Sequence, residues 1–332
     1  MFIYSLKRII WVIPVVIGVL LLVFFFQSLT GDDIVFRLLG ENSTAEARAA
    51  LREQMGLDDP MLVQMGRYIW GFITRGDLGT SYVTKQPITT ELMLRFPVTL
   101  QLTFLSISLG ICVGVPLGII ATLRQYSLAD SAILTFAVLT ASMPGFWLGL
   151  MMISFFAVSL GWLPAAGILT WKGWIMPTVA VSVTSMSNII RVTRTSMLEV
   201  IRQDFIRTAK AKGQKLSVIT IRHAFRNSLI PIIATIGNSL GLQLGGALAI
   251  ESVFSVPGIG KYAVDAISFR NFPAVSGSVV LLAIVFIIVN LVIDLLYTVA
   301  DPRLKTAFTK GRMVKRKRDK VTDISNGGIG DG

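Results

Sequence analysis

The chain has 332 residues, of which 53% are hydrophobic and 15% are charged, and its mean hydropathy is +0.69. A soluble domain of this length needs more polar surface, so the composition indicates an integral membrane protein. The net charge of +12 could favour nucleic acid, but the Lys and Arg residues cluster beside apolar runs and in the tail, and membrane topology explains them better. The single cysteine, Cys112, excludes a disulfide framework and a cysteine-based metal site. For the single histidine, His223, we expect a local structural role.

Six apolar runs predict six transmembrane helices with both termini in the cytoplasm. The first run resembles a signal peptide, but it is too long and lacks a small-residue cleavage site, so we expect it to be retained. Under this topology 21 Lys and Arg residues belong to the inner side, counting Arg191 at the inner end of the fourth run, and ten belong to the outer segments, in agreement with the positive-inside rule. Pro144 and Gly145 fall in the middle of the third run and are expected to bend it. The predicted spans cover residues 9–29, 98–123, 131–160, 174–193, 229–250 and 275–299.

Residues 31–96 form a polar segment that we expect on the external side. A helix is predicted over 44–55, with capping residues at 42–44 and Gly56 as its stop, and a second helix over 61–74. Residues 76–82 are typical of a turn-rich loop, and Pro87 is expected to begin a short helix that ends at Leu94. The segment is either a solvated connector or a cap over the outer mouth of the bundle.

The most informative stretch is residues 197–231, a basic, helix-forming segment between the fourth and fifth apolar runs. It carries seven Lys and Arg residues but only two acids, Glu199 and Asp204. A first helix is predicted over 197–212 with Gly213 as its stop, because glycine adopts the left-handed cap conformation without a Cβ penalty. Ser217 is expected to cap a second helix that meets the next span at Pro231. The predicted apolar stripes are Leu198, Ile201, Phe205 and Ala209 in the first helix, and Ile221, Phe225 and Leu229 in the second.

From the pattern alone this segment is either a solvated basic loop or a docking element for a cytoplasmic partner. Residues 204–213 (DFIRTAKAKG) and 222–231 (RHAFRNSLIP) resemble the cytoplasmic EAA loop of ABC-type permeases of the dipeptide/oligopeptide/nickel import family. In that family the loop forms the coupling helix, which sits in a groove of the ATP-hydrolysing subunit. Arg207, Thr208 and Ala209 stand in the Glu-Ala-Ala place, Gly213 is kept, and the proline arrives later, as in the peptide and nickel branch. The resemblance therefore implies an ATPase-coupling loop within residues 194–228, with Asp204, Arg207, Thr208, Ala209, Lys210, Ala211 and Gly213 as its site residues.

Polar and small residues in the fourth and fifth runs mark either helix packing or a solute path. The inner half of the fourth run is rich in hydroxyl and amide side chains, and three glycines recur every fourth residue in the fifth run. Small residues at this spacing let two helix backbones approach closely, within one chain or between two permease subunits, whereas hydroxyls and amides also suit a wet path. The candidate residues are Ser187, Asn188, Asn238, Gly241, Gln243 and Gly245. Asp294, in the inner half of the sixth run, is expected to pair with a basic residue.

Residues 251–273 (ESVFSVPGIGKYAVDAISFRNFP) are predicted to be external and to make a tight re-entrant turn around their proline and glycines. They resemble the outer loop between the fifth and sixth helices of the same permease family, and the external segment ending at residues 95–101 resembles its N-terminal external region. The loop is either an outer gate or a seat for a binding protein, or else a packed structural loop. Its family-like residues are Glu251, Phe254, Pro257, Gly258 and Gly260.

The resemblance covers residues 1–303 and implies an all-α integral membrane protein with the six-helix fold of type I ABC importer permeases. It divides the chain into a first helix (1–30), an external segment (31–96), a five-helix core (97–303) and a basic tail (304–332), which we expect to be disordered and to bind anionic lipid. The implied partners are a second, related permease, two ATP-binding subunits and an extracytoplasmic solute-binding protein, without nucleic acid. The implied location is the plasma (inner) membrane of a bacterium or archaeon.

No catalytic or metal-binding set is visible in the sequence. Because it lacks a phosphate-binding Gly-rich loop followed by Lys and Ser/Thr, we expect no cofactor in this chain, with ATP and Mg²⁺ on the partner ATPase subunits. We expect ATP-driven import of dipeptides or oligopeptides, and nickel or a metal chelate is the alternative within the family. An ATPase-independent secondary transporter or channel is the alternative from another class. It predicts an internal repeat and ionisable residues near the membrane centre, and we find neither.

Overall fold

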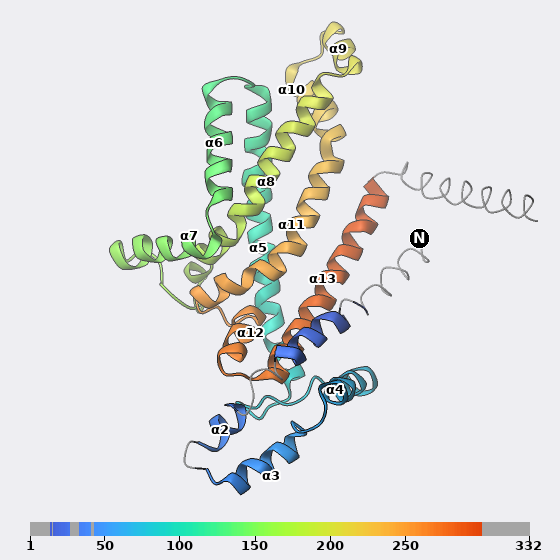
Figure 1. The fold of residues 1–332 in the computed structure, drawn as a ribbon. Helices are drawn as coiled ribbons and strands as arrows, with labels where there is room; N and C mark the ends of the chain where they lie inside the picture. Colours follow the sequence, from blue (N-terminus) through green and yellow to red (C-terminus); the bar gives the residue numbers. More distant parts are fainter. Residues whose placement is uncertain (1–13, 15, 27–32, 41–42, 301–332) are drawn as a thin grey trace, which may run out of the picture.

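The computed structural model describes residue 14 and residues 16–26, 33–40 and 43–300 (Figure 1). Over these residues the chain is helical and has no strand, apart from an isolated bridge between Thr80 and Pro87. The prediction of an all-α fold is therefore confirmed. Both termini, the side chain of Asp294 and residues 301–332, which include the basic tail, lie outside the described residues.

Four described helices are long and apolar enough to cross a membrane, and a fifth span is present if α6 and α7 are counted together. The first predicted span is described only as the shorter apolar helix Val16–Phe26. The four long helices are α5 (Ile88–Leu123), α8 (Ile175–Ile201), α11 (Arg226–Val253) and α13 (Phe272–Ala300). The described part of the chain thus contains four or five of the six predicted spans and a piece of the first.

The third predicted span is broken rather than bent. The axes of α6 (Leu128–Ser142) and of α7 (Gly145–Met152), which continues as a π-helix over Ile153–Ser159, differ by 99°. Met143 has an extended backbone with ψ 127°, the conformation favoured before a proline, and α7 begins anew after Pro144. The single helix predicted over 131–160 is therefore wrong, and α7 projects sideways from the bundle (Figure 1).

The centre of the bundle is the packed pair α5 and α8, with α6, α7 and α11 also in contact with α8. Gly110, Gly114 and Gly118 of α5 allow the two backbones to approach closely. A β-carbon at Gly118 would lie 2.6 Å from Cβ of Thr193, and one at Gly110 would lie 3.0 Å from Oγ of Ser185. This close contact extends over about two helical turns and holds α8 firmly in the bundle.

The external segment begins with three helices, α2 (Asp33–Leu39), α3 (Ala45–Met55) and α4 (Met61–Arg75). Both predicted helices are confirmed: the Thr44 side chain caps α3 by accepting from the backbone N–H of Ala47, and Gly56 ends it at φ 64°. The separate short helix predicted from Pro87 to Leu94 is wrong, because these residues are the first turns of α5. That helix continues without a break through Pro97.

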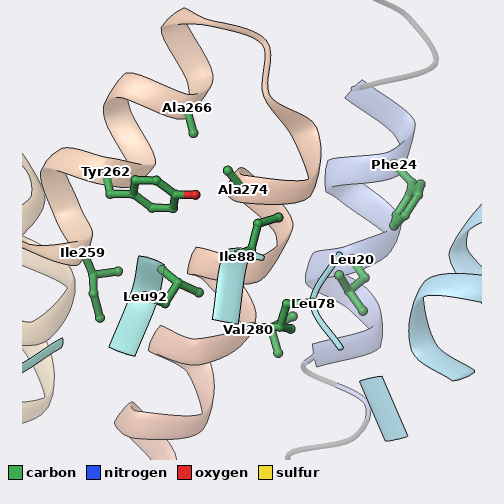
Figure 2. Close-up of a cluster of buried hydrophobic side chains, with 10 residues drawn as sticks. All are labelled: Leu20, Phe24, Leu78, Ile88, Leu92, Ile259, Tyr262, Ala266, Ala274 and Val280. Atoms are coloured by element: carbon green, nitrogen blue, oxygen red, sulfur yellow. The ribbon is translucent and has the colours of Figure 1, made fainter. Parts of the chain in front are cut away.

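A buried apolar cluster joins the external segment to the ends of the spans, on the side of the bundle opposite α9 (Figures 1 and 2). It includes residues from the first apolar helix, from the external segment and α5, from α12 (Ile259–Ser268) and from α13. Its buried members are Leu20, Phe24, Leu78, Ile88, Leu92, Ile259, Tyr262, Ala266, Ala274 and Val280. The outer parts of the chain therefore pack as one unit.

Candidate functional site

The 197–231 segment forms a corner that projects from one end of the bundle (Figure 1). Helix α8 ends at Ile201, and α9 (Asp204–Ala211) begins after Gln203, which has an extended backbone with ψ 152°. The single helix predicted over 197–212 is therefore wrong. In a straight helix Ile206 would lie half a turn away from Met197, at 100° per residue, whereas the corner brings both side chains into one buried cluster.

This cluster attaches α9 to α8 and to the helix that follows it. Its buried members are Met197, Val200, Ile206, Ala209, Ile219 and Ala224. The predicted stripes are wrong at two positions, because Phe205 and Ile221 are 42% and 64% exposed while their neighbours Ile206 and Ile219 are buried. Among the predicted coupling residues Ala209 faces the cluster. The others are exposed at the corner: Asp204, Arg207, Thr208, Lys210, Ala211 and Gly213.

Gly213 ends the corner helix as predicted. Its φ is 73°, and its backbone N–H bonds to the carbonyl of Lys210. The next helix is preceded by Lys215, with no side-chain cap, so the prediction that Ser217 caps it is wrong. Helix α10 (Leu216–Val218) and the π-helix Ile219–Phe225 run directly into α11, and Pro231 therefore lies inside a helix rather than at a junction. His223 Nε2 lies 2.8 Å from Oε1 of Gln214, which ties the π-helix to the turn.

An ion pair that we did not predict lies at the same end of the bundle. Arg194 of α8 donates from Nε and Nη2 to the two carboxylate oxygens of Asp130, at 2.7 and 2.8 Å. Asp130 is buried in the first turn of α6, where its second oxygen also accepts from the backbone N–H of Tyr126. A sequence signal was present: Ser127 caps α6, and Asp130 stands at the acidic position of a capping box. The pair fixes the inner turn between α5 and α6 to α8.

The exposed surfaces of α8 and α11 carry a run of polar side chains that we call the polar face. It consists of Thr184, Asn188, Arg191 and Thr195 of α8 and Asn227, Thr235 and Asn238 of α11, each exposed or half-buried. The exposed surfaces of α5 and α6 differ, because most of their exposed large side chains are apolar, although Gln101 and Thr135 are exposed there too. The exposed apolar side chains include Phe104, Leu105, Ile120, Phe136, Val138 and Leu139. The contrast distinguishes a surface suited to water from surfaces suited to lipid.

Both halves of the polar face point to the same side of the bundle. Helices α8 and α11 run antiparallel, since the 202–225 segment joins them at one end, and Gln243 Nε2 donates to Ser185 Oγ at 2.7 Å across their contact. At 100° per residue, the α8 members lie within about 80° of the contact residue Val181. The α11 members lie about 80–160° around the axis of α11 from Gln243. Because the two helices run antiparallel, this rotation turns them toward the same side of the bundle as the α8 members.

The structure separates the candidate path residues into two groups. Ser187 and Gln243 are buried in helix contacts, Ser187 with Thr140 at 2.7 Å and Gln243 with Ser185. Gly241 packs against α13, since a β-carbon there would lie 3.0 Å from the Phe286 ring. The three remaining candidates, Asn188, Asn238 and Gly245, are exposed or half-buried on α8 and α11, and a β-carbon at Gly245 would meet nothing within 4 Å.

The outer loop is organised around the buried carboxylate of Glu251, at the end of α11. This carboxylate accepts from Thr99 Oγ1 of α5 at 2.7 Å and from the backbone N–H of Lys261 in α12 at 3.1 Å. A β-carbon at Gly258 would overlap the carboxylate, and one at Gly260 would lie 2.6 Å from Cα of Leu248. The side chain of Phe254 is buried against α8 and α5 residues, whereas Pro257 is exposed. These contacts describe a packed junction of three helices.

A second polar contact joins α5 to α12 on the outer side. The Tyr262 hydroxyl donates to the buried carboxylate of Glu91, and the Arg95 guanidinium lies 4.5 Å from the centre of the Tyr262 ring. Burial and the Glu91 carboxylate raise the pKa of Tyr262 well above its ordinary value, so the phenol keeps its proton and its donor role. The outer ends of these helices are therefore held by hydrogen bonds as well as by apolar packing.

The external segment also encloses a cavity of about 630 Å³ between α3, α4 and the 76–86 loop. Arg67, Arg75 and Lys85 contribute cationic side chains to its lining, and Arg67 is paired with Asp59. Tyr68 also lines it, and burial, with a smaller contribution from Asp77, raises the pKa of this phenol.

Comparison with known families gives two adjoining matches. Residues 114–306 match the family described as "Binding-protein-dependent transport system inner membrane component", and residues 1–103 match "Binding-prot-dependent transport system membrane comp, N-term". The chain is 36% identical over 302 residues to the glutathione transport system permease protein GsiC of Salmonella paratyphi A, covering 91% of this chain and 98% of that protein. It is 35% identical over 308 residues to a putative peptide transport system permease protein of Brucella abortus, covering 90% and 98%.

Solved structures of similar fold come from ABC transporters. A chain of the inward-facing MetNI methionine ABC transporter aligns with a TM-score of 0.55 and 20% identity, over 64% of this chain and 96% of that chain. A chain of an amino acid ABC transporter aligns with a TM-score of 0.50 and 14% identity, over 65% and 94%. At these identities the structures show the fold alone. Through its family matches and its relatives, this chain belongs to the inner membrane components of binding-protein-dependent transport systems, the multi-pass permease subunits of ABC importers.

Proposed function

We propose that this permease imports peptide-like solutes and that α9 transmits the motion of ATPase subunits to the spans. The observation that carries the proposal is the corner at α9, where a short exposed helix is fixed to α8 by buried side chains. The exposed surface of the corner is positively charged, because it carries Arg207, Lys210 and Lys212. Such a surface suits a groove with acidic residues on an ATPase subunit.

Contacts at the corner provide a route for force from α9 into the bundle. Ile206 and Ala209 are packed against Met197 and Val200 of α8, so a displacement of α9 moves the end of α8. Helix α8 in turn contacts α5, α6 and α11, and the Asp130–Arg194 pair joins it to α6. One helix that packs on several others suits a rocking motion of the spans as a body.

The solute path runs along the polar face of α8 and α11, and a second permease subunit of the same fold encloses it. Polar side chains on a membrane-spanning surface are costly in lipid, and a water-filled path between two subunits removes that cost. The binding protein docks at the opposite end from α9, where α4, α12 and the 76–86 loop form the outer surface. ATP and Mg²⁺ are held by the ATPase subunits.

The proposed substrates are small peptides, because relatives at 35 and 36% identity are named for peptides and for glutathione, which is itself a tripeptide. This favours peptides over a nickel chelate. The test is uptake of labelled peptides into proteoliposomes that contain this chain with its partner permease, ATPase subunits and binding protein. We expect uptake that requires ATP and all four components. Uptake that persists without the ATPase subunits would overturn the proposal.

A further inference from the structure

The polar face carries one charged residue within the spans, Arg191. Between residues 175 and 193 of α8 the sequence has no other Lys, Arg, Asp or Glu, and between residues 229 and 250 of α11 it has none. The Arg191 side chain is exposed on the polar face, in line with Thr184, Asn188 and Thr195. Its place in an otherwise uncharged stretch calls for a physical reason, because a cation in a membrane span is costly.

Arg191 lies in the inner part of the span. It follows Trp174 by 17 residues, so it lies about 25 Å along the axis from that outer-side ring, within a hydrocarbon core of about 30 Å. Gly118, about one and a half turns before the inner end of α5, packs against Ile190 and Thr193, which flank Arg191 on α8. The guanidinium therefore lies inside the bundle's span, one to two turns from its inner end.

The Arg191 side chain is held by a hydrogen bond to a neutral amide, and its positive charge is not paired with a carboxylate among the described residues. Its Nη2 donates to Oδ1 of Asn188 at 2.5 Å, and among the described residues no carboxylate lies within ion-pair distance of it. Arg194, one turn further on, differs because both its bonds go to Asp130. A guanidinium has five N–H donors, so Arg191 retains free donors in a fixed fork after bonding to an amide.

We propose that Arg191 is the anion-selecting residue of the solute path, and that its guanidinium binds the additional carboxylate that an acidic peptide carries besides its C-terminal one, with Asn188 as the residue that positions it. This inference rests on the proposed function, because it takes the polar face as the path. A guanidinium fork matches a carboxylate in a bidentate geometry, which favours peptides with a net negative charge over neutral ones.

The local positive potential is tested first, without any substrate. In the complete complex, with native Cys112 replaced by alanine, Thr195→Cys is labelled with an anionic and with a cationic methanethiosulfonate reagent of equal size. Thr195 lies one helical turn from Arg191, so Arg191→Gln is expected to lower the anionic-to-cationic rate ratio by about three- to tenfold. Arg124→Gln, which removes an exposed arginine at the inner turn away from the polar face, should leave the ratio unchanged.

Uptake of two peptides tests the substrate class. Glutathione carries two carboxylates and one amine, and dialanine is neutral overall. In proteoliposomes with the complete complex, Arg191→Gln is expected to lower glutathione uptake by about tenfold, the loss of one hydrogen-bonded charge contact, and dialanine uptake by less than about twofold. Arg191→Lys keeps the charge and should retain a larger share of glutathione uptake than Arg191→Gln does.

Two results would overturn the inference: a reagent ratio that does not respond to Arg191→Gln, or an equal loss of uptake for both peptides. The second result would assign Arg191 a structural role. A wild-type complex that imports neither peptide would instead overturn the proposed function and the substrate class together. In that case the reagent ratio alone decides whether Arg191 makes the polar face attractive to anions.

Discussion

Breaking the ion pair between Asp130 and Arg194 should lower the free energy of unfolding by a measurable amount. The Asp130 side chain is 4% exposed and that of Arg194 is 19% exposed, and two hydrogen bonds join them. Asp130→Asn or Arg194→Gln alone leaves a partly buried charge without its partner, which costs about 3–5 kcal/mol. That is a large part of the roughly 5–15 kcal/mol that stabilises a typical protein. The double variant leaves two neutral groups that can still hydrogen bond, so its cost should be smaller than the sum by about 2 kcal/mol.

The free energy of unfolding of the four proteins is measured in mixed micelles with a rising fraction of sodium dodecyl sulfate, by circular dichroism. Arg124→Gln is the matched control: this arginine is exposed in the same turn, and its replacement should change the free energy by less than about 0.5 kcal/mol. Single variants that cost less than about 1 kcal/mol, or costs that simply add in the double variant, would refute the view that this pair holds α6 on α8.

Three further predictions concern the outer loop, the corner and the polar face. Gly258→Ala places a methyl group on the Glu251 carboxylate and should lower the melting temperature of the complex by several degrees; an unchanged melting temperature would contradict the packed junction. Ala209→Leu overfills the buried cluster under α9, at a cost of about 1–3 kcal/mol in stability. It should lower the rate of peptide uptake by a larger factor than the rate of ATP hydrolysis. Asn238→Cys should react with a water-soluble thiol reagent in the complete complex while Leu139→Cys, on an apolar surface, should not; equal reactivity would argue against the polar face as the path.

Features with local causes could be predicted from the sequence. The helix over 44–55 can be predicted because Thr44 and Gly56 supply its two caps within the chain segment itself, and Gly213 marks the end of α9 by the same local signal. The membrane class follows from composition alone, whereas the all-α fold is what the family resemblance implies. The caps depend on residues a few positions apart, so no tertiary contact is needed to predict them.

Features set by tertiary packing were missed or shifted. The break at Arg202 and Gln203 contains neither proline nor glycine, and it exists because Met197 and Ile206 share one buried cluster only when the chain turns between them. The same packing buries Ile219 in place of Ile221. Arg194 is 64 residues from Asp130, and the sequence suggested a cap at Asp130 without indicating its partner. Spacing alone could not tell that Gly241 faces α13 while Gly245 is open.

The central claim is that an ATPase subunit grips α9. Its most direct measurement is cross-linking of Arg207→Cys, which is fully outside the buried cluster, to single cysteines on the ATPase subunit in the assembled complex lacking Cys112. We expect a cross-link from Arg207→Cys whose yield changes when ATP is added, and none from Thr80→Cys on the outer side. A corner cysteine that forms no cross-link to the ATPase and remains freely reactive toward reagents in the assembled, active complex would contradict the account.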